Sequence, residues 1–340
     1  MAETDSTLQA SLRSVAFHRV HAEKGEGVEL ARQFKVTAYP TFIVLNDKAE
    51  TITRFMGFPG PERFGAIVKS ARTDPTPLAT REARFARKPT EKDAAALAEA
   101  YAGQGDLKRA VDTYQRARTL AGAEGARYAF PIFQNQAQGL SGQGRNPPAF
   151  TPDDLKPTAD LVIANPKATQ EEIMTVAYTM TNLALQTNQP DLLAPYVTAA
   201  LRINETAVEP RFAELRRELA VVEALYVRHD KPAALALKRA QMPAGWESDP
   251  DQLTAFAGWC LQNDLNLEEA ERLAGQAAQR AALGKARATA LNIQGQVQFK
   301  RGRVAEAIKS IEGALVEVPG NPYLTKQLAQ FRAALPGGGN

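Results

Sequence analysis

Cysteine is almost absent from this chain of 340 residues, because Cys260 is the only one. An internal disulfide is therefore excluded. Dithiol exchange within the chain is excluded too, since that reaction needs an attacking thiolate and a second, resolving thiol. Cys260 lies in an apolar helical pattern, so we expect a small buried thiol rather than a reactive one. A single cysteine does not identify the compartment, because it is compatible with either redox environment.

Long apolar runs, clustered metal ligands and an excess of one charge are also missing. No run approaches the roughly 18 apolar residues that span a membrane. The 41 basic and 38 acidic residues are too balanced to favour nucleic acid or an anionic membrane as a partner. The three histidines lack carboxylate or thiol neighbours at ligand spacing, and no glycine-rich phosphate loop is present. We therefore expect no metal and no cofactor.

The start of the chain carries no targeting signal that the sequence makes visible. The first residues are polar and acidic, and no apolar segment of a signal peptide follows Met1. A cytoplasmic location is the expectation. A signal peptide upstream of Met1 would instead make the protein periplasmic or secreted.

What the sequence does contain changes character near residue 73. Before that point, short β-prone runs and helical spacings alternate, as in an α/β region that covers residues 1–73. Asn46 to Ala49 is typical of a turn, so the two strands around it should form a hairpin. The expected elements, in chain order, are a strand at 15–20, a helix at 27–34, strands at 41–45 and 51–55, and a helix from Pro61.

The rest of the chain reads as a linker followed by helices. Residues 74–92 contain prolines and several basic side chains, and we expect a solvated linker there. Residues 93–336 are alanine-rich with helical spacing, and residues 337–340 should form a disordered tail. Glycines and prolines between Ala126 and Phe150 predict a long loop or irregular insertion inside the helical part.

Internal repeats organise the helical part. Leu97 to Tyr101, followed by Ala110 and Tyr114, resembles the tetratricopeptide repeat, whose period is about 34 residues. Small residues let two antiparallel helices approach closely, and large ones fill the groove between neighbouring pairs, so the pairs must stack. The alternative is an irregular helical bundle. The residues expected in the repeat core are Leu97, Ala98, Tyr101, Ala110, Tyr114, Gly258, Ala270, Gly295, Ala307 and Pro319.

The N-terminal region resembles the thioredoxin family over roughly residues 6–72. The resemblance rests on the segment Ala38-Tyr39-Pro40-Thr41-Phe42, which follows a helix ending before Val36, and on Gly57 after the second strand of the hairpin. It implies a cis peptide bond before Pro40 and an extended peptide that pairs beside it. Tyr39, Pro40 and Thr41 are therefore the candidate peptide-binding residues. An ordinary trans proline at the start of a strand is the alternative.

The same resemblance identifies a missing part. The family places two further strands and a C-x-x-C motif before this region, whereas here only a short helix with Leu8 and Leu12 on its apolar face precedes residue 15. We expect open strand edges and exposed apolar surface, through which the chain could self-associate. Either the natural sequence starts upstream, or the remnant leans on the helical domain or on a second chain.

The expected fold is mostly α: a tetratricopeptide-like α-solenoid preceded by a partial thioredoxin-like α/β domain. This architecture resembles the chaperedoxin group, which implies a module that holds client proteins. Because the chain has no thiol pair, we expect it not to be an enzyme as written. The implied partners are proteins, unfolded or extended peptides and a chaperonin, with no nucleic acid and no membrane. The alternative function is a thiol–disulfide oxidoreductase whose C-x-x-C part is missing from this sequence. A pure assembly scaffold is a third possibility.

Overall fold

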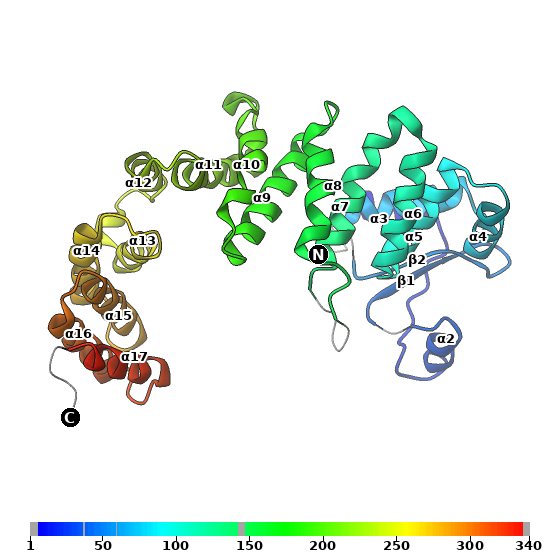
Figure 1. Ribbon diagram of the computed structural model, residues 1–340. Helices are drawn as coiled ribbons and strands as arrows, with labels where there is room; N and C mark the ends of the chain where they lie inside the picture. Colours follow the sequence, from blue (N-terminus) through cyan, green and yellow to red (C-terminus); the bar gives the residue numbers. More distant parts are fainter. Residues whose placement is uncertain (1–5, 37, 59, 142–146, 336–340) are drawn as a thin grey trace. The chain divides into compact units, whose positions relative to one another are not determined.

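The computed structural model describes residues 6–36, 38–58, 60–141 and 147–335. Helices dominate these residues, and their one sheet has two strands, so the mostly α fold is confirmed (Figure 1). None of the described helices is long and apolar enough to cross a membrane. The predicted tail at 337–340 lies outside the described residues.

The chain divides into two compact units, Met1–Phe212 and Ala213–Asn340. This division does not coincide with the predicted boundary at residues 73–92. The elements of unit 1 are α1 (Ser6–Arg13), α2 (Gly27–Gln33), β1 (Thr41–Leu45), β2 (Thr51–Met56), α3 (Pro61–Thr73), α4 (Leu78–Arg87), α5 (Glu91–Gly103), α6 (Leu107–Leu120), the 3-10 helix η1 (Gly122–Tyr128), α7 (Ala129–Gln138), α8 (Pro152–Ala164), α9 (Gln170–Gln186) and α10 (Ala194–Leu201). Those of unit 2 are α11 (Ala213–Val222), continued by a π-helical turn η5 (Glu223–Val227), α12 (Lys231–Ala240), α13 (Pro250–Gln262), α14 (Leu267–Arg280), α15 (Lys285–Lys300), α16 (Val304–Glu317) and α17 (Pro322–Ala333).

The predicted hairpin forms at the expected place. β1 and β2 pair antiparallel, with Thr41 opposite Met56 and a register irregularity at the end near the turn. In that turn the Asn46 side chain accepts hydrogen bonds from the backbone N–H groups of Lys48 and Glu50, at 3.0 and 2.9 Å. This arrangement fixes the tight connection between the strands, because an asparagine side chain can replace a backbone acceptor in a turn.

One face of the hairpin is covered by α1 and α3. Leu8, Phe55, Phe64 and Val68 form a buried cluster there. α1 is short, as expected, and α3 starts with Pro61, which supplies the fixed backbone angle of a first helical turn. The small core therefore combines two strands with helices from both sides of the sequence.

The predicted strand at residues 15–20 is wrong. Residues 16–20 take no regular secondary structure, and Phe17 and Val20 are 52% and 48% exposed. A strand is stable only when a neighbour accepts its backbone hydrogen bonds, and no such neighbour lies among the described residues. β-propensity alone does not hold this segment in a sheet.

The β1–β2 hairpin packs against the first pair of repeat helices, α5 and α6. β2 packs against the C-terminal end of α5, where a Cβ atom at Gly103 would lie 2.8 Å from the carbonyl oxygen of Arg54. A Cβ atom at Gly105 would approach the side chain of Met56 to 2.7 Å. Glycine at these two positions permits the close contact, which explains why the N-terminal region and the first repeats form one compact unit.

Residues 74–92, predicted to be a solvated linker, instead contain helix α4. The Arg81 side chain is buried: it donates to the carbonyl oxygens of Asp74 at 2.7 Å and Thr76 at 3.1 Å, and it pairs with the Asp74 carboxylate at 3.0 Å. Phe85 joins the core cluster of α5 and α6. The prolines at 75 and 77 do follow the end of α3, as expected, and Arg81 and Arg84 are tied into the fold, whereas Arg87 and Lys88 are exposed.

The predicted loop between Ala126 and Phe150 is also partly wrong. Residues 129–138 form α7, whose Ile132 and Phe133 side chains are almost fully buried. Glycine-rich sequence follows only after this helix, and residues 142–146 lie outside the described residues. The helix replaces the loop because its apolar side chains fill the space beside α6 and α8.

Helical hairpins repeat through both units. Their first helices begin at residues 91, 129, 170, 213, 250 and 285, and α17 begins at 322. Five of the hairpins share one turn, in which a residue with left-handed backbone ends the first helix and the next N–H bonds to a carbonyl in the last turn. These five turns are centred on Gly105, Asn188, His229, Asp264 and Gly302. The internal similarity predicted from the sequence is therefore present in backbone geometry.

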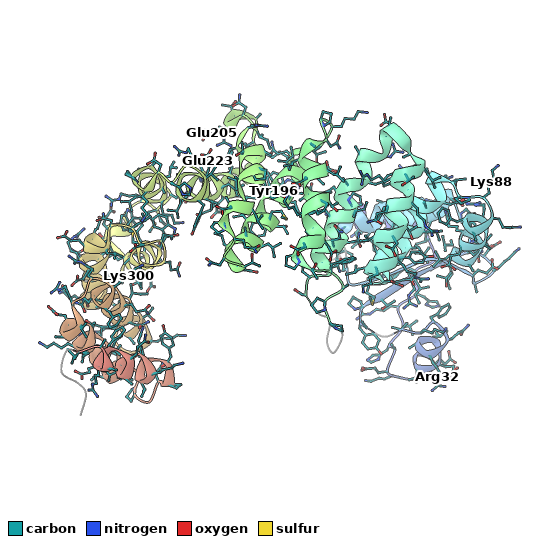
Figure 2. All side chains as sticks on the ribbon, in the orientation of Figure 1. Arg32, Lys88, Tyr196, Glu205, Glu223 and Lys300 are labelled. Atoms are coloured by element: carbon teal, nitrogen blue, oxygen red, sulfur yellow. The ribbon has the colours of Figure 1, made fainter. Side chains whose placement is uncertain are left out.

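Each unit has its own interior. In unit 1, Tyr196 of α10 is fully buried and donates its hydroxyl hydrogen to the Asp160 carboxylate at 2.8 Å, whereas Arg32 and Lys88 are exposed (Figure 2). In unit 2, Trp246, Phe256 and Cys260 belong to one cluster formed by α13, α14 and α15. Gly295 brings α15 close to Ile311 of α16, as the small-residue argument predicts.

Candidate functional site

The predicted peptide-binding residues lie at one end of the β1–β2 hairpin. The Tyr39–Pro40 bond is cis, as expected. The Pro40 carbonyl accepts a hydrogen bond from the Gly57 N–H at 2.8 Å, and the Thr41 hydroxyl donates to the Ala38 carbonyl at 2.6 Å. The Tyr39 side chain is 60% exposed. The segment thus holds an aromatic side chain in solvent beside an ordered strand end.

β1 has an open edge. In an antiparallel pair, alternate residues direct both backbone groups toward the partner. The Pro40 carbonyl bonds to the Gly57 N–H, so the backbone groups of Phe42 and Val44 also point toward β2. The backbone N–H and C=O groups of Thr41 and Ile43 point away from β2. No second strand pairs there among the described residues. This edge is a template for one further strand.

The composition of β1 does not protect that edge. Natural edge strands are often guarded by charged side chains, proline or a bulge. Thr41–Leu45 contains no charge and no proline, and its register irregularity lies at the Val44–Leu45 end, beyond Thr41 and Ile43. Phe42 and Val44 pack toward the cluster around Phe64. Ile43 lies on the opposite face, because successive side chains of a strand alternate. The strand therefore carries apolar side chains on both faces, as strands in the middle of a sheet do.

Exposed apolar side chains surround the hairpin in sequence. Phe58 is 48% exposed, with its ring centroid 6.4 Å from that of Phe42 and 6.1 Å from that of Phe64. Single exposed apolar residues are ordinary, so what distinguishes this region is how many of them occur in one short stretch of sequence. The group within residues 17–58 comprises Phe17, Val20, Val28, Leu30, Tyr39, Leu45 and Phe58.

The strand opposite the open edge is well anchored. The Arg54 guanidinium of β2 donates to the carbonyl oxygens of Phe34 at 2.9 Å and Lys35 at 3.2 Å, at the C-terminal end of α2. A cation at this helix end also complements the helix dipole. Together with the contact of β2 with α5, this interaction holds the hairpin while its outer edge stays free.

Most of the predicted repeat-core residues are buried, and two are not. Tyr101 is the most informative of the buried ones, because it donates its hydroxyl hydrogen to Glu82 at 2.7 Å, and burial raises its pKa to about 12. Gly258 is half-buried. Pro319 is exposed in the turn after α16, so it ends a helix rather than filling the core. The buried members are Leu97, Ala98, Tyr101, Ala110, Tyr114, Ala270, Gly295 and Ala307.

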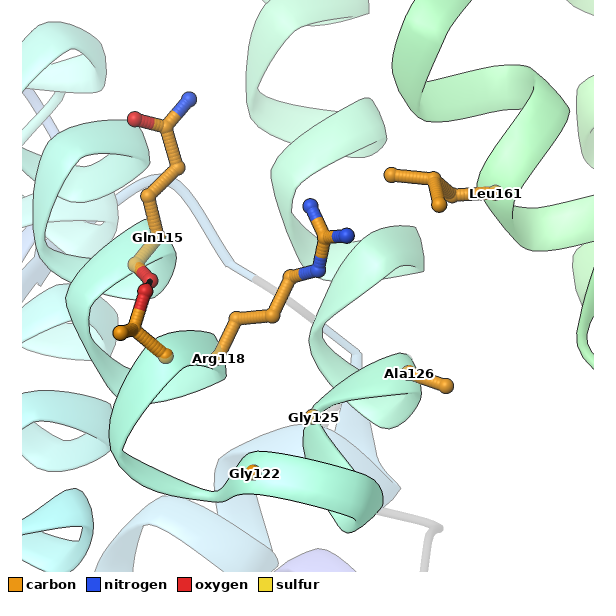
Figure 3. Close-up of a pocket in the computed structure, with 7 residues that line it drawn as sticks. Gln115, Arg118, Gly122, Gly125, Ala126 and Leu161 are labelled. Atoms are coloured by element: carbon orange, nitrogen blue, oxygen red, sulfur yellow. Dashed lines mark hydrogen bonds between the residues drawn. The ribbon is translucent and has the colours of Figure 1, made fainter.

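A second candidate site, which the sequence did not predict, is a hollow of about 550 Å³ in unit 1. It lies between the end of α6, η1 and α8. Figure 3 shows Arg118 and Leu161 reaching toward one another across it from α6 and α8. Its lining consists of Gln115, Arg118, Thr119, Gly122, Gly125, Ala126 and Leu161. No motif in the sequence separates Arg118 from the other arginines, so only the packing reveals this site.

The chemistry of the remaining reactive groups is limited. Cys260 is fully buried, as predicted, and burial together with the nearby Glu269 carboxylate raises its pKa to about 12. The described residues contain no group of three histidine, cysteine or carboxylate side chains that could hold a metal ion. His18 and His21 lie in irregular backbone.

Comparison with known proteins adds little to this description. No family model matches the chain, and no curated protein matches it. Among solved structures, it is similar to a tetratricopeptide repeat protein from Parabacteroides merdae ATCC 43184, with 12% identity and a TM-score of 0.36 over 75% of this chain and 90% of that one. The class that the fold defines, a protein of repeated helical hairpins with a small N-terminal β-hairpin, comes from the chain's own geometry.

Proposed function

We propose that the protein is a binding module for proteins and extended peptides, and that a peptide adds as a strand to the open edge of β1. The observation that carries this proposal is the uncharged edge formed by Thr41 and Ile43, next to the exposed Tyr39 ring. Strand addition supplies affinity through backbone hydrogen bonds and therefore tolerates many sequences. Such tolerance suits a protein that holds unfolded clients.

The thioredoxin-like reading of residues 1–73 belongs to the same proposal. The β1–β2 hairpin, α3 and the Tyr39–Pro40 segment follow the order expected from that family. In this reading the tetratricopeptide-like hairpins of residues 93–336 recruit partner proteins, and a chaperonin is among the partners that the chaperedoxin-like architecture implies. Repeated helical hairpins commonly present extended surfaces for protein ligands.

Dithiol exchange has no support from this chain. Its single thiol is buried in α13 and its pKa is raised, so the reactive thiolate is disfavoured. The oxidoreductase alternative needs a C-x-x-C segment outside the sequence described. A binding role needs no such addition.

The test is the binding of a permanently unfolded, carboxymethylated polypeptide to the full chain, measured by fluorescence anisotropy. Ile43→Lys places a charge on the open strand, and we expect affinity to fall about tenfold or more. Tyr39→Ala should weaken binding less. The matched control is Tyr323→Ala, since Tyr323 of α17 is 58% exposed and Tyr39 is 60% exposed. Unchanged binding by Ile43→Lys would refute strand addition at β1.

A further inference from the structure

The hollow between α6, η1 and α8 contains an unusual arginine. Arg118 is half-buried, and no hydrogen bond or ion pair joins its side chain to any described residue. Arg109 and Arg127 are paired, with Asp106 at 2.7 Å and with Glu91 at 2.9 Å. Arg116 has no ion pair among the described residues either, but it is exposed and does not line the hollow. Arg118 is the one charged residue in the lining. Its guanidinium therefore offers donors to a ligand without first breaking an ion pair.

The nearest acidic side chain of η1 is already engaged. Glu124 accepts hydrogen bonds from Lys167 at 3.3 Å and lies 3.8 Å from the Arg127 guanidinium. These contacts hold the Glu124 carboxylate with cations other than Arg118. The hollow thus keeps one uncompensated positive charge, and the ligand that fits it carries one negative charge.

Small residues keep the hollow open. Gly122, Gly125 and Ala126 present backbone rather than long side chains on the η1 side. A Cβ atom at Gly125 would lie 2.3 Å from the Arg118 carbonyl oxygen, so glycine is needed for η1 to approach α6 this closely. The space beside the guanidinium is therefore built into the packing of the two elements.

The rest of the lining indicates what accompanies the negative charge. Leu161 of α8 is 37% exposed and is the one large apolar side chain in the lining. Gln115 and Thr119 add an amide and a hydroxyl. A carboxylate matches the planar fork of a guanidinium through two parallel hydrogen bonds. Leu161 suits an apolar neighbour of that carboxylate.

We propose that this hollow binds a carboxylate of a partner polypeptide, either an acidic side chain flanked by apolar residues or a chain-terminal carboxylate. The inference goes beyond the proposed function and does not rest on it, because the hollow shares no residue with the β1 edge. Its consequence is a second contact in unit 1 that selects partners by charge, whereas strand addition at β1 is indifferent to sequence.

Three labelled peptides of the same length distinguish the sources of the carboxylate. The first has a central glutamate between leucines and blocked ends, the second has glutamine instead, and the third has glutamine with a free C-terminus. Binding to the full chain is measured by fluorescence anisotropy. Binding of the first peptide assigns the site to an acidic side chain, and binding of only the third assigns it to a chain terminus. Equal binding of all three, or of none, would overturn the proposal.

Variants of Arg118 connect this binding to the hollow. We expect Arg118→Gln to weaken binding of the carboxylate peptide at least tenfold and Arg118→Lys to weaken it less, because lysine keeps the charge but loses the fork. Arg116→Gln, two residues away on α6, is the matched control and should bind as the unchanged protein does. Thermal melts should coincide, since Arg118 has no described partner to lose. Unchanged affinity of Arg118→Gln would overturn the proposal, while Ile43→Lys, which tests the β1 edge, should leave this binding intact.

Discussion

The N-terminal hairpin region and the helical hairpins of unit 2 bury apolar surface in different ways. Among the residues that the structure describes, seven large apolar side chains are exposed within 17–58 and four in the much longer unit 2. The unit 2 cluster around Phe256 contains several side chains with no exposed surface. A helix completes its backbone hydrogen bonds within itself, but a strand depends on its neighbours. The repeats therefore satisfy their backbone hydrogen bonds within each helix, whereas the two-stranded sheet leaves the outer backbone groups of β1 without a strand partner among the described residues.

The largest expected effect comes from paired core truncations. Phe256→Ala should destabilise unit 2 by about 4 kcal/mol, because it removes an almost fully buried ring packed 5.0 Å from the Trp246 ring. Phe64→Ala should unfold the N-terminal region while most helical signal survives. Denaturant titration followed by circular dichroism measures both. Equal loss of helical signal in the two variants would show that the regions are not energetically distinct.

A buried ion-pair network gives the next largest effect. Glu271 of α14 accepts hydrogen bonds from Gln298 at 3.1 Å, from Arg303 at 2.6 Å and from Arg301. Glu271→Ala should cost about 2 kcal/mol, because it leaves the buried Gln298 amide and the partly exposed guanidiniums of Arg301 and Arg303 without this acceptor. The control Glu306→Ala removes an exposed partner of the same Arg303, and its midpoint in denaturant should barely move. A small effect of Glu271→Ala would mean that the network contributes little to unit 2.

The open edge should also change how the chain associates. At high concentration, β1 of one copy can pair with β1 of another, and we expect a concentration-dependent dimer by sedimentation velocity. Ile43→Lys should weaken that association about tenfold or more. Val316→Lys, which charges a 77% exposed apolar position in unit 2, is the control and should associate as before. A protein that stays monomeric at all concentrations would contradict a sticky edge.

The smallest effect concerns acid stability of the first helical hairpin. The Arg84 guanidinium beside Asp93, helped by the Thr90 hydroxyl, lowers the pKa of the Asp93 carboxyl below its usual 3.8. Its contribution is therefore present at neutral pH and is lost as the pH falls below about 4, through the lowered folded-state pKa. Because Arg84 is 44% exposed, we expect about 1 kcal/mol. Thermal melts of Asp93→Asn should show a smaller loss of stability between neutral and acidic pH than the unchanged chain shows.

Local patterns predicted the parts of the fold that local interactions determine. The β1–β2 hairpin follows from alternating strands around Asn46, and the repeat hairpins follow from small residues at fixed spacing. The burial of Arg81 was not predicted, because it depends on two backbone carbonyls and the Asp74 carboxylate, which a basic run does not reveal. Residues 16–20 do not form the expected strand, because no described strand lies beside them to accept their backbone hydrogen bonds.

One of the two candidate sites could be predicted from the sequence and the other could not. Tyr39, Pro40 and Thr41 could be chosen from a family motif, and the structure places them at an exposed strand end. Arg118 could not be chosen, because its lack of a partner depends on where Glu124 and other acidic groups lie in three dimensions. Sequence reasoning finds residues that a motif marks, while a site defined by packing needs the fold.

Amide hydrogen exchange of β1 tests the central claim most directly. In the dilute free protein, the outward amides of Thr41 and Ile43 should exchange at least tenfold faster than those of Phe42 and Val44, which face β2. Adding the unfolded polypeptide should slow the outward pair and leave the helices of unit 2 unchanged. Outward amides that are already slow in the free monomer, or that stay fast at saturating peptide, would contradict an open edge that binds strands.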